Sequence, residues 1–153
     1  MQMELRKMRR IGVIGGARCG PEFQKTAYEV GQFIAQNKAI LVCGGLIGVM
    51  EAAARGAKEA GGITVGILPG NLPNDANRYI DIPIATGLGY SRNSLVAMNA
   101  DALIAVNGEY GTLTEIAYGC IYGKKVIGLG TWNIPGVIQA ESPDKAVELA
   151  LKK

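Results

Sequence analysis

Short aliphatic runs alternate with longer helical patterns along almost the whole chain, and this alternation is the strongest constraint on the fold. Each run has the length of a strand and ends near glycine or another turn-forming residue. The runs are 11–15, 39–43, 63–68, 79–84 (broken at Pro83), 101–106 and 125–129. Strands that alternate with helices of about ten or more residues form parallel sheets through right-handed crossovers. The sequence therefore predicts an α/β, Rossmann-like doubly wound fold, with a mainly parallel sheet and helices on both faces.

The length of 153 residues suits one domain with a single core. We assign residues 11–153 to this domain and interpret residues 1–10 as a frayed, basic N-terminal leader. The leader has no apolar segment of the signal-peptide kind, and no run reaches the roughly 18 apolar residues of a membrane span. We therefore expect a cytoplasmic protein without a membrane partner. The net charge is +3, with no basic stripe interleaved with aromatic residues, so we do not expect a nucleic-acid partner.

The chain contains no histidine, which excludes histidine-based nucleophilic catalysis and histidine metal sites. The three cysteines are widely spaced and form no CxxC pair, so they predict reduced thiols and neither a zinc site nor a disulfide framework. We expect no metal site. Acid–base chemistry would then depend on carboxylates, tyrosines or lysines.

The stretch Asp101–Glu115, DALIAVNGEYGTLTE, combines a strand, a glycine-bearing turn and the start of a helix. This geometry points free backbone N–H groups at an anion. Glu115 lies one turn into the helix, close enough to act on a group attached to that anion. An alternative stays open, because Thr112-x-x-Glu115 is also a capping box, in which the two side chains only satisfy the start of the helix.

Three glycine clusters follow strands and are expected at the carboxyl edge of the sheet: Gly15-Gly16, Gly44-Gly45 and Gly108–Gly111. The first does not have the spacing of a dinucleotide fingerprint, and no P-loop pattern is present. Several glycine turns at one edge suit a phosphorylated ligand, although each one alone is more often just a tight turn. Arg92, near the start of the helix expected at about Ser91–Asn99, could bind a phosphate or carboxylate, or form a surface ion pair.

Three ordered motifs resemble one family over nearly the whole chain: GGLIGVME at 44–51, SRN at 91–93 and ADALIAVNGEYGTLTE at 100–115. They are similar to the proteins labelled "possible lysine decarboxylase", the LOG-like superfamily. It includes the cytokinin-activating phosphoribohydrolases and the molybdenum cofactor carrier proteins. The stretch around SRN looks more like the small bacterial branch near the carriers. Nothing marks the Schiff-base lysine of a pyridoxal phosphate decarboxylase, so we discount that name.

The phosphoribohydrolase resemblance implies a set of site residues. A phosphate would lie at Gly108, Gly111 and Thr112, and Arg92 and Glu115 would act at the ribose and the glycosidic bond. Gly44, Gly45 and Met50 would line the pocket. Departure of the base builds positive charge on the sugar, which a carboxylate can stabilise while it positions water. We add Gly15, Gly16 and Asn93 as candidate ligand-binding residues.

Two departures from the family pattern leave two functions open. Glu109 replaces a glycine of the phosphate turn, and Asn93 replaces a lysine beside Arg92. The first hypothesis is hydrolysis of the N-glycosidic bond of a nucleoside 5′-monophosphate, which requires no cofactor. The second is a non-catalytic carrier of the molybdenum cofactor or a nucleotide. In both, the partner is a phosphorylated small molecule, and we expect a homodimer or homotetramer that associates through the helices after Ser91 and Thr112.

Overall fold

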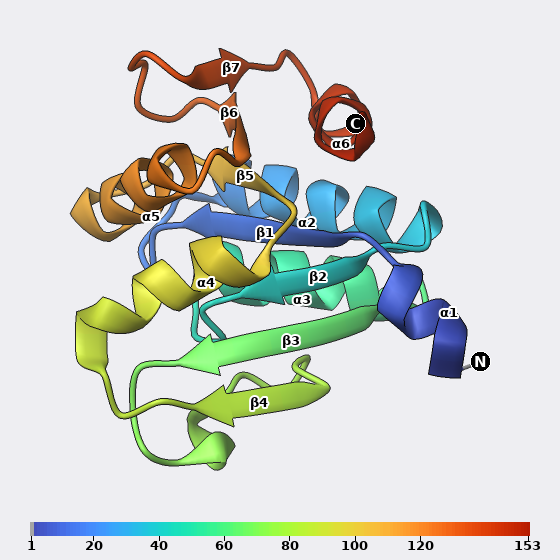
Figure 1. Ribbon diagram of the computed structural model, residues 1–153, viewed down its shortest axis with the longest axis vertical. Coiled ribbons are helices and arrows are strands. Elements are labelled where there is room, and N and C mark those ends of the chain that lie inside the picture. Colours follow the sequence, from blue (N-terminus) through green and yellow to red (C-terminus); the bar gives the residue numbers. More distant parts are fainter. Residues whose placement is uncertain (1) are drawn as a thin grey trace.

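The computed structural model describes residues 2–153, with the backbone alone at residues 2 and 3. The strands are parallel throughout and form one sheet in the order β4-β3-β2-β1-β5-β6-β7 (Figure 1). The strands are β1 (Arg10–Gly15), β2 (Ile40–Cys43), β3 (Ile63–Leu68), β4 (Ile82–Ala85), β5 (Ala102–Val106), β6 (Lys125–Leu129) and β7 (Val137–Gln139). The predicted α/β, Rossmann-like fold is confirmed.

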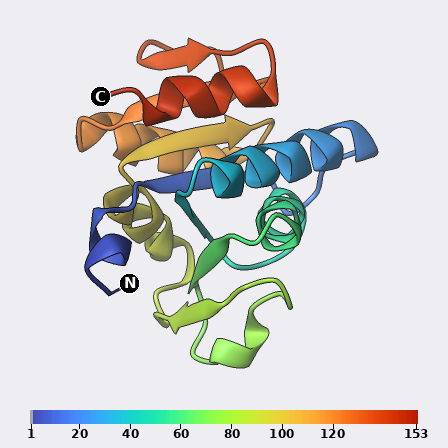
Figure 2. The same ribbon diagram turned by 90° about the vertical axis from the view of Figure 1, so that its right-hand side faces the viewer.

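Helices cover both faces of the sheet (Figure 2). The helices are α1 (Gln2–Lys7), α2 (Pro21–Gln36), α3 (Val49–Glu59), α4 (Asn93–Asn99), α5 (Tyr110–Ile121) and α6 (Pro143–Leu151), with short 3-10 turns η1 (Pro73–Asp75) and η2 (Gly89–Arg92). One core cluster joins the sheet to α2, α3 and α6. The other joins the opposite face to α4 and α5. No helix in the described part of the chain is both long and apolar enough to cross a membrane.

The order of the strands reverses between β1 and β5, which lie side by side at the centre of the sheet. The chain first runs outward from β1 to β4, then returns to β5 and continues to β7. Every residue of β5 is buried, because helices cover it on both faces. Ligands of such sheets bind beyond the carboxyl ends of the strands at this reversal. The turns after β1 and β5 are therefore in the position that the sequence analysis expected.

The structure differs from the sequence analysis in three local features. Residues 2–7 of the expected leader form helix α1, and Arg10 already belongs to β1, with its backbone N–H bound to Asp101. The fourth strand begins at Ile82, later than expected, and includes Pro83. Proline is tolerated there because β4 is an edge strand and pairs only with β3. Strand β7 was not predicted, since its three residues are too few to show a pattern.

Helices α2 and α3 cross closely because glycine occupies both sides of the contact. A Cβ atom at Gly31 would lie 1.9 Å from the carbonyl oxygen of Ala53, and one at Gly56 would lie 2.0 Å from that of Tyr28. We expect Gly31→Ala to lower the free energy of unfolding by about 1–3 kcal/mol, because the helices must move apart. Chemical denaturation measures this change. Gly20→Ala is the control, since its Cβ would meet nothing within 4 Å, and equal stabilities of the two variants would contradict the prediction.

Candidate functional site

Helix α5 begins at Tyr110, three residues before the start at Leu113 that a Thr112 capping box requires. Glu109 is the N-cap residue, and no side chain caps the helix. The capping-box alternative is therefore wrong: Thr112 is the third helical residue and is buried. In the described hydrogen-bond network the backbone N–H groups of Gly111 and Thr112 have no partner, as expected for the first turn of a helix. The start of α5 is thus a candidate anion site.

Glu115 lies one turn further along α5 and is buried, with 6% of its surface exposed. Burial raises the pKa of its carboxyl group to about 8, while the positive charge of Arg92 acts in the opposite direction. The carboxyl group of Glu115 therefore holds its proton at neutral pH. The buried thiol of Cys43, at the end of β2, is a third member of this group. Burial raises the pKa of this thiol to about 12, and the charges of Arg92 and Glu115 both affect it.

Arg92 is buried against the carboxyl end of β2, with 8% of its surface exposed. A Cβ atom at Gly44 would lie 2.8 Å from the guanidinium carbon and 2.7 Å from the sulfur of Met50. The glycine therefore leaves the room that the guanidinium group fills. Burial lowers the pKa of Arg92, and the nearby Glu115 partly offsets this effect. Among the described residues, no carboxylate lies within 4.0 Å of Arg92, and its buried Nε donates no hydrogen bond.

Asn93 links Arg92 to helix α5. Its Oδ1 accepts a hydrogen bond from Arg92, and its Nδ2 donates to the Gly111 carbonyl (3.4 Å) and to Thr114 Oγ1 (3.0 Å). The side chain of Asn93 is buried, and these hydrogen bonds already occupy its Oδ1 and its Nδ2. The ligand-binding role of Asn93 stays a prediction; in this structure its side chain joins Arg92 to the start of α5.

The glycines divide into two groups. Gly108 has φ 121° and packs on the Thr112 side chain, and Gly16 lies under the Glu109 carboxyl group. Gly16 therefore belongs to the turn after β1 and Gly108 to the turn after β5. Gly15 and Gly45 do not face Arg92. A Cβ at Gly15 would meet Val106 and Val49, and one at Gly45 would meet Leu68 and Gly66. The backbone of Gly45 is also bound to Asn77 and the Cys43 sulfur. Packing explains the glycine at 15, and packing together with a φ of 79° explains the glycine at 45.

Sequence reasoning missed the residues that hold the β5 turn from the side of β6. Thr131 Oγ1 donates to the Asn107 carbonyl, and Trp132 Nε1 donates to the Glu109 carbonyl at 3.2 Å. The Trp132 ring packs against Tyr110, with the ring centroids 6.0 Å apart. One signal was available: Trp132 is the single tryptophan of the chain and follows closely after a strand.

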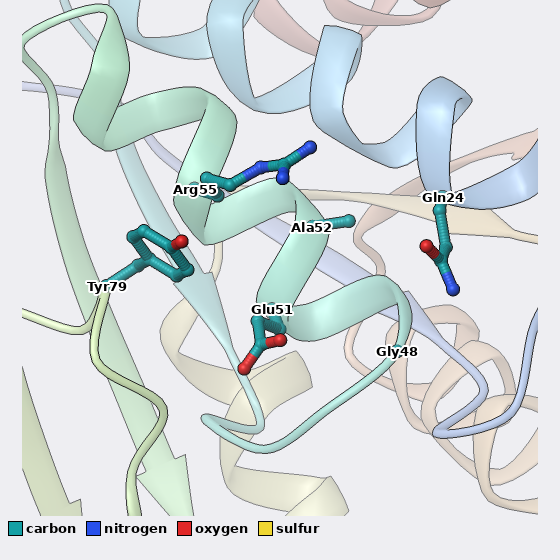
Figure 3. A pocket seen from close by; sticks show the side chains of 6 residues that line it. All are labelled: Gln24, Gly48, Glu51, Ala52, Arg55 and Tyr79. Carbon is teal, nitrogen blue, oxygen red and sulfur yellow. The ribbon is translucent and has the colours of Figure 1, made fainter. Parts of the chain in front are cut away.

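Two hollows on the surface lie apart from Arg92 and Glu115. The first lies between the starts of α2 and α3 and is lined by Gln24, Gly48, Glu51, Ala52, Arg55 and Tyr79 (Figure 3). The second is mostly apolar and lies beside α4, on the face of β2, β3 and β4. In the described residues, no group of three or more cysteine and acidic side chains could hold a metal ion. Arg92 and Glu115 are buried and line neither of these two hollows.

The amino-acid sequence matches the model of a known protein family. The family model described as the SLOG cluster4 family covers residues 8–152. The chain belongs to this family. The resemblance to the LOG-like superfamily that the motifs predicted is confirmed.

Relatives include both kinds of protein that the motifs resemble. The chain is 44% identical over 149 residues to an uncharacterised protein of Archaeoglobus fulgidus, covering 95% of this chain and 96% of that one. It is 29% identical to the cytokinin riboside 5′-monophosphate phosphoribohydrolase LOG3 of Arabidopsis thaliana, covering 95% of this chain and 73% of the enzyme. The structure of the molybdenum cofactor binding protein of Rippkaea orientalis superposes with a TM-score of 0.88 at 37% identity, covering 93% and 94%.

Proposed function

We propose that this protein binds a phosphorylated small molecule at the start of α5 and hydrolyses the N-glycosidic bond of a nucleoside 5′-monophosphate. The observation that carries the proposal is the buried pair of Arg92 and Glu115. At neutral pH the arginine is charged, Glu115 is mostly protonated, and no carboxylate within 4.0 Å neutralises Arg92 among the described residues. A buried charge without a counter-ion is costly, so an anionic ligand would stabilise this arrangement.

The proposed reaction breaks the bond between C1′ of the ribose and a nitrogen of the base, and water supplies the hydroxyl group at C1′. The departing base must gain a proton. A carboxyl group with a pKa near neutral is suited to donate it. An anionic ligand beside Glu115 raises its pKa further, which favours the protonated form in the complex. This pKa supports a general-acid role for Glu115, whereas the sequence analysis expected an ionised carboxylate that stabilises the sugar.

Incubation with each nucleoside 5′-monophosphate tests the proposal. We expect release of free base and ribose 5-phosphate in equal amounts, and separation of the products by chromatography measures both. Arg92→Met should abolish the release, because it removes the buried positive charge and keeps an unbranched side chain. Absence of free base with every monophosphate would refute the reaction and leave ligand binding to be measured separately.

A second candidate function is supported by a specific observation. Glu115 is almost fully buried, and neither surface hollow reaches it, so a ligand could rest on the glycine turns without touching its carboxyl group. Such a protein would carry a phosphorylated pterin, as in a molybdenum cofactor carrier. The similarity to the Rippkaea orientalis protein favours this candidate. Tight binding of the molybdenum cofactor without base release from any nucleotide would decide for it.

We expect the protein to self-associate through α4, the end of α5 and the neighbouring strand β4. Val96 and Ile116, two residues predicted for this interface, are instead buried in the core. Met98 on α4, Ile121 on α5 and Ile84 on β4 remain exposed by 49%, 72% and 44%. Such an apolar face favours contact with a second copy. Light scattering should give a dimer or tetramer at micromolar concentration.

Met98→Glu tests this surface, because it places a charge in the centre of the proposed contact. We expect the variant to shift toward the monomer in the same measurement. Ile138→Glu is the matched control: Ile138 is 45% exposed, but it lies on β7 at the other edge of the sheet. A monomeric wild-type protein would refute the prediction, and equal effects of the two variants would refute the surface.

A further inference from the structure

Among the described residues, the side chain of Asn93 is the only hydrogen-bond partner of the buried Arg92 guanidinium group. The Oδ1 of Asn93 accepts this bond, and the Nε of Arg92 is buried without a partner. Asn93 has only 3% of its surface exposed, so bulk water has little access to these atoms. The orientation of the guanidinium group therefore depends on the amide of Asn93.

The other end of this amide acts on the first turn of α5. Its Nδ2 donates to the Gly111 carbonyl at 3.4 Å and to Thr114 Oγ1 at 3.0 Å, and Thr114 Oγ1 donates to the same carbonyl at 2.6 Å. The Gly111 carbonyl and the Thr112 N–H belong to one planar trans peptide unit, so they point in opposite directions. Contacts that fix the carbonyl therefore also fix the Thr112 N–H, which is a free donor of the candidate anion site.

An amide oxygen orients Arg92 without neutralising it. In the described part of the chain no carboxylate lies within 4.0 Å of the guanidinium group, so its positive charge stays available to an anion. An aspartate at position 93 would have nearly the same size and could accept the same hydrogen bond, but it would add a negative charge in contact with Arg92. Opposite charges in contact attract strongly where water is largely excluded, so such a residue would compete with an anionic ligand.

We propose that Asn93 is a positioning residue for the anionic ligand: its amide fixes the guanidinium group of Arg92 relative to the first turn of α5 and leaves the charge of Arg92 for the ligand. The inference rests on the proposed function, because it takes the start of α5 as the phosphate site. In this role Asn93 acts through Arg92 and through the Gly111–Thr112 peptide, and it does not itself contact the ligand.

Calorimetry at pH 7 tests the proposal, with inorganic phosphate and the four nucleoside 5′-monophosphates as probes. Asn93→Ala keeps the charge of Arg92 and removes the hydrogen bonds on both sides, so the affinity for the best probe should fall about three- to tenfold. Asn93→Asp keeps the bond to Arg92 and neutralises its charge, so the affinity should fall at least about tenfold below that of Asn93→Ala. Asn37→Asp, an exposed change at the end of α2, adds the same charge elsewhere and should leave the affinity unchanged.

The stability of the protein without ligand, measured against pH, is a readout that a merely structural role would not move. The charge of Arg92 lowers the pKa of Glu115 against the effect of burial, and Cys43 is the other ionisable group beside them. Asn93→Asp weakens this effect of Arg92, so the pKa of Glu115 should rise and the loss of stability should extend to higher pH. Urea denaturation of each protein and its Glu115→Gln counterpart measures the change. Asn37→Asp should not produce it.

The outcomes separate this inference from the proposed function. Unchanged affinity in Asn93→Ala would overturn the positioning role and leave the phosphate site intact. An affinity of Asn93→Asp equal to or above that of Asn93→Ala, or an unmoved titration of Glu115 in folded Asn93→Asp, would overturn it as well. Failure of the folded wild-type protein to bind any of the probes would overturn the phosphate site, and this inference with it.

Thr114→Val keeps the proposal testable if changes at the buried Asn93 prevent folding. Thr114 is exposed, and its hydroxyl group bonds both to Asn93 Nδ2 and to the Gly111 carbonyl. We expect this variant to fold and to bind the best probe about two- to tenfold more weakly, because the Gly111–Thr112 peptide loses one of its supports. Wild-type affinity in Thr114→Val would contradict the role assigned to this network.

Discussion

The free energy of unfolding is expected to fall as the pH rises from about 5 to about 9, because of the side chain of Glu115. The pKa of this carboxyl group is about 8 in the folded protein and 4.5 ordinarily. Between these values the folded state holds a proton that the unfolded state has released, so a rise in pH favours unfolding. A difference of one in pKa corresponds to about 1.4 kcal/mol, so the loss approaches roughly 5 kcal/mol above pH 8.

The difference between wild-type protein and Glu115→Gln isolates this contribution. Glutamine has nearly the same shape as the protonated acid, so the two proteins should be about equally stable near pH 5. Above pH 8 the variant should be more stable by several kcal/mol, since glutamine cannot become charged. Urea denaturation at several pH values measures both curves. The pKa of Asp81 lies below 3.8, outside this window, and burial raises that of Cys43 from 9.0 to about 12. Cys43 therefore lowers stability only from about pH 9 upward, and it does so equally in the wild-type protein and in Glu115→Gln.

Glu4→Gln serves as the control, because Glu4 is exposed on α1 and its loss should leave the wild-type profile unchanged. Parallel pH profiles for wild-type protein and Glu115→Gln would contradict the prediction. They would mean that the buried carboxyl group loses its proton at an ordinary pH, and that the general-acid role assigned to it has no basis.

Much of the fold could be predicted from the sequence because the central strands are continuous aliphatic runs. Strands β3 and β6 have the expected bounds, Ile63–Leu68 and Lys125–Leu129, since both are buried on their inner side and bounded by glycine or lysine. The edge strands were harder. Pro83 was interpreted as a break in the strand, whereas proline within a strand run can equally indicate an edge strand, which pairs on one side only.

That Arg92 and Glu115 lie near each other could be predicted from the sequence, whereas the contacts of their neighbours could not. Arg92 and Glu115 lie 23 positions apart, and the order of strands and helices alone indicated that both follow the carboxyl ends of strands. The role of Asn93 depends on Thr114 and the Gly111 carbonyl, which only the packing of α4 against α5 brings within reach. The start of α5 was misplaced because Thr112 and Glu115 have the spacing of a capping box by coincidence.

Both the misplaced start of α5 and the unpredicted packing concern Glu115. A capping glutamate would be solvated and charged, whereas a buried glutamate beside Arg92 is mostly protonated at neutral pH. The sequence could not distinguish the two, because the burial of Glu115 depends on other elements, which place Arg92 and Cys43 near it. The protonation state is therefore the property on which both the stability profile and the proposed chemistry depend.

Glu115→Gln is also expected to lower the rate of base release at least about 10²-fold at neutral pH, the usual contribution of a positioned general acid. Glutamine cannot donate the proton that the departing base needs. Single-turnover release of free base measures the rate, with the best monophosphate as substrate. Wild-type kcat/KM should fall as the pH rises through about 8, since only the protonated carboxyl group is active. If the ionised carboxylate acts instead, as the sequence analysis expected, kcat/KM should rise over the same range.

The stability prediction makes this test decisive, because Glu115→Gln should be at least as stable as the wild-type protein at neutral pH. A loss of turnover could then not be attributed to unfolding, and a thermal melt of both proteins checks that point. Ligand affinity should stay within a few-fold, since neutral Glu115 and glutamine present the same charge to the phosphate. Unchanged turnover in an active preparation would eliminate the catalytic role of Glu115. No turnover in either protein, with tight binding of the phosphorylated ligand in both, would identify a carrier.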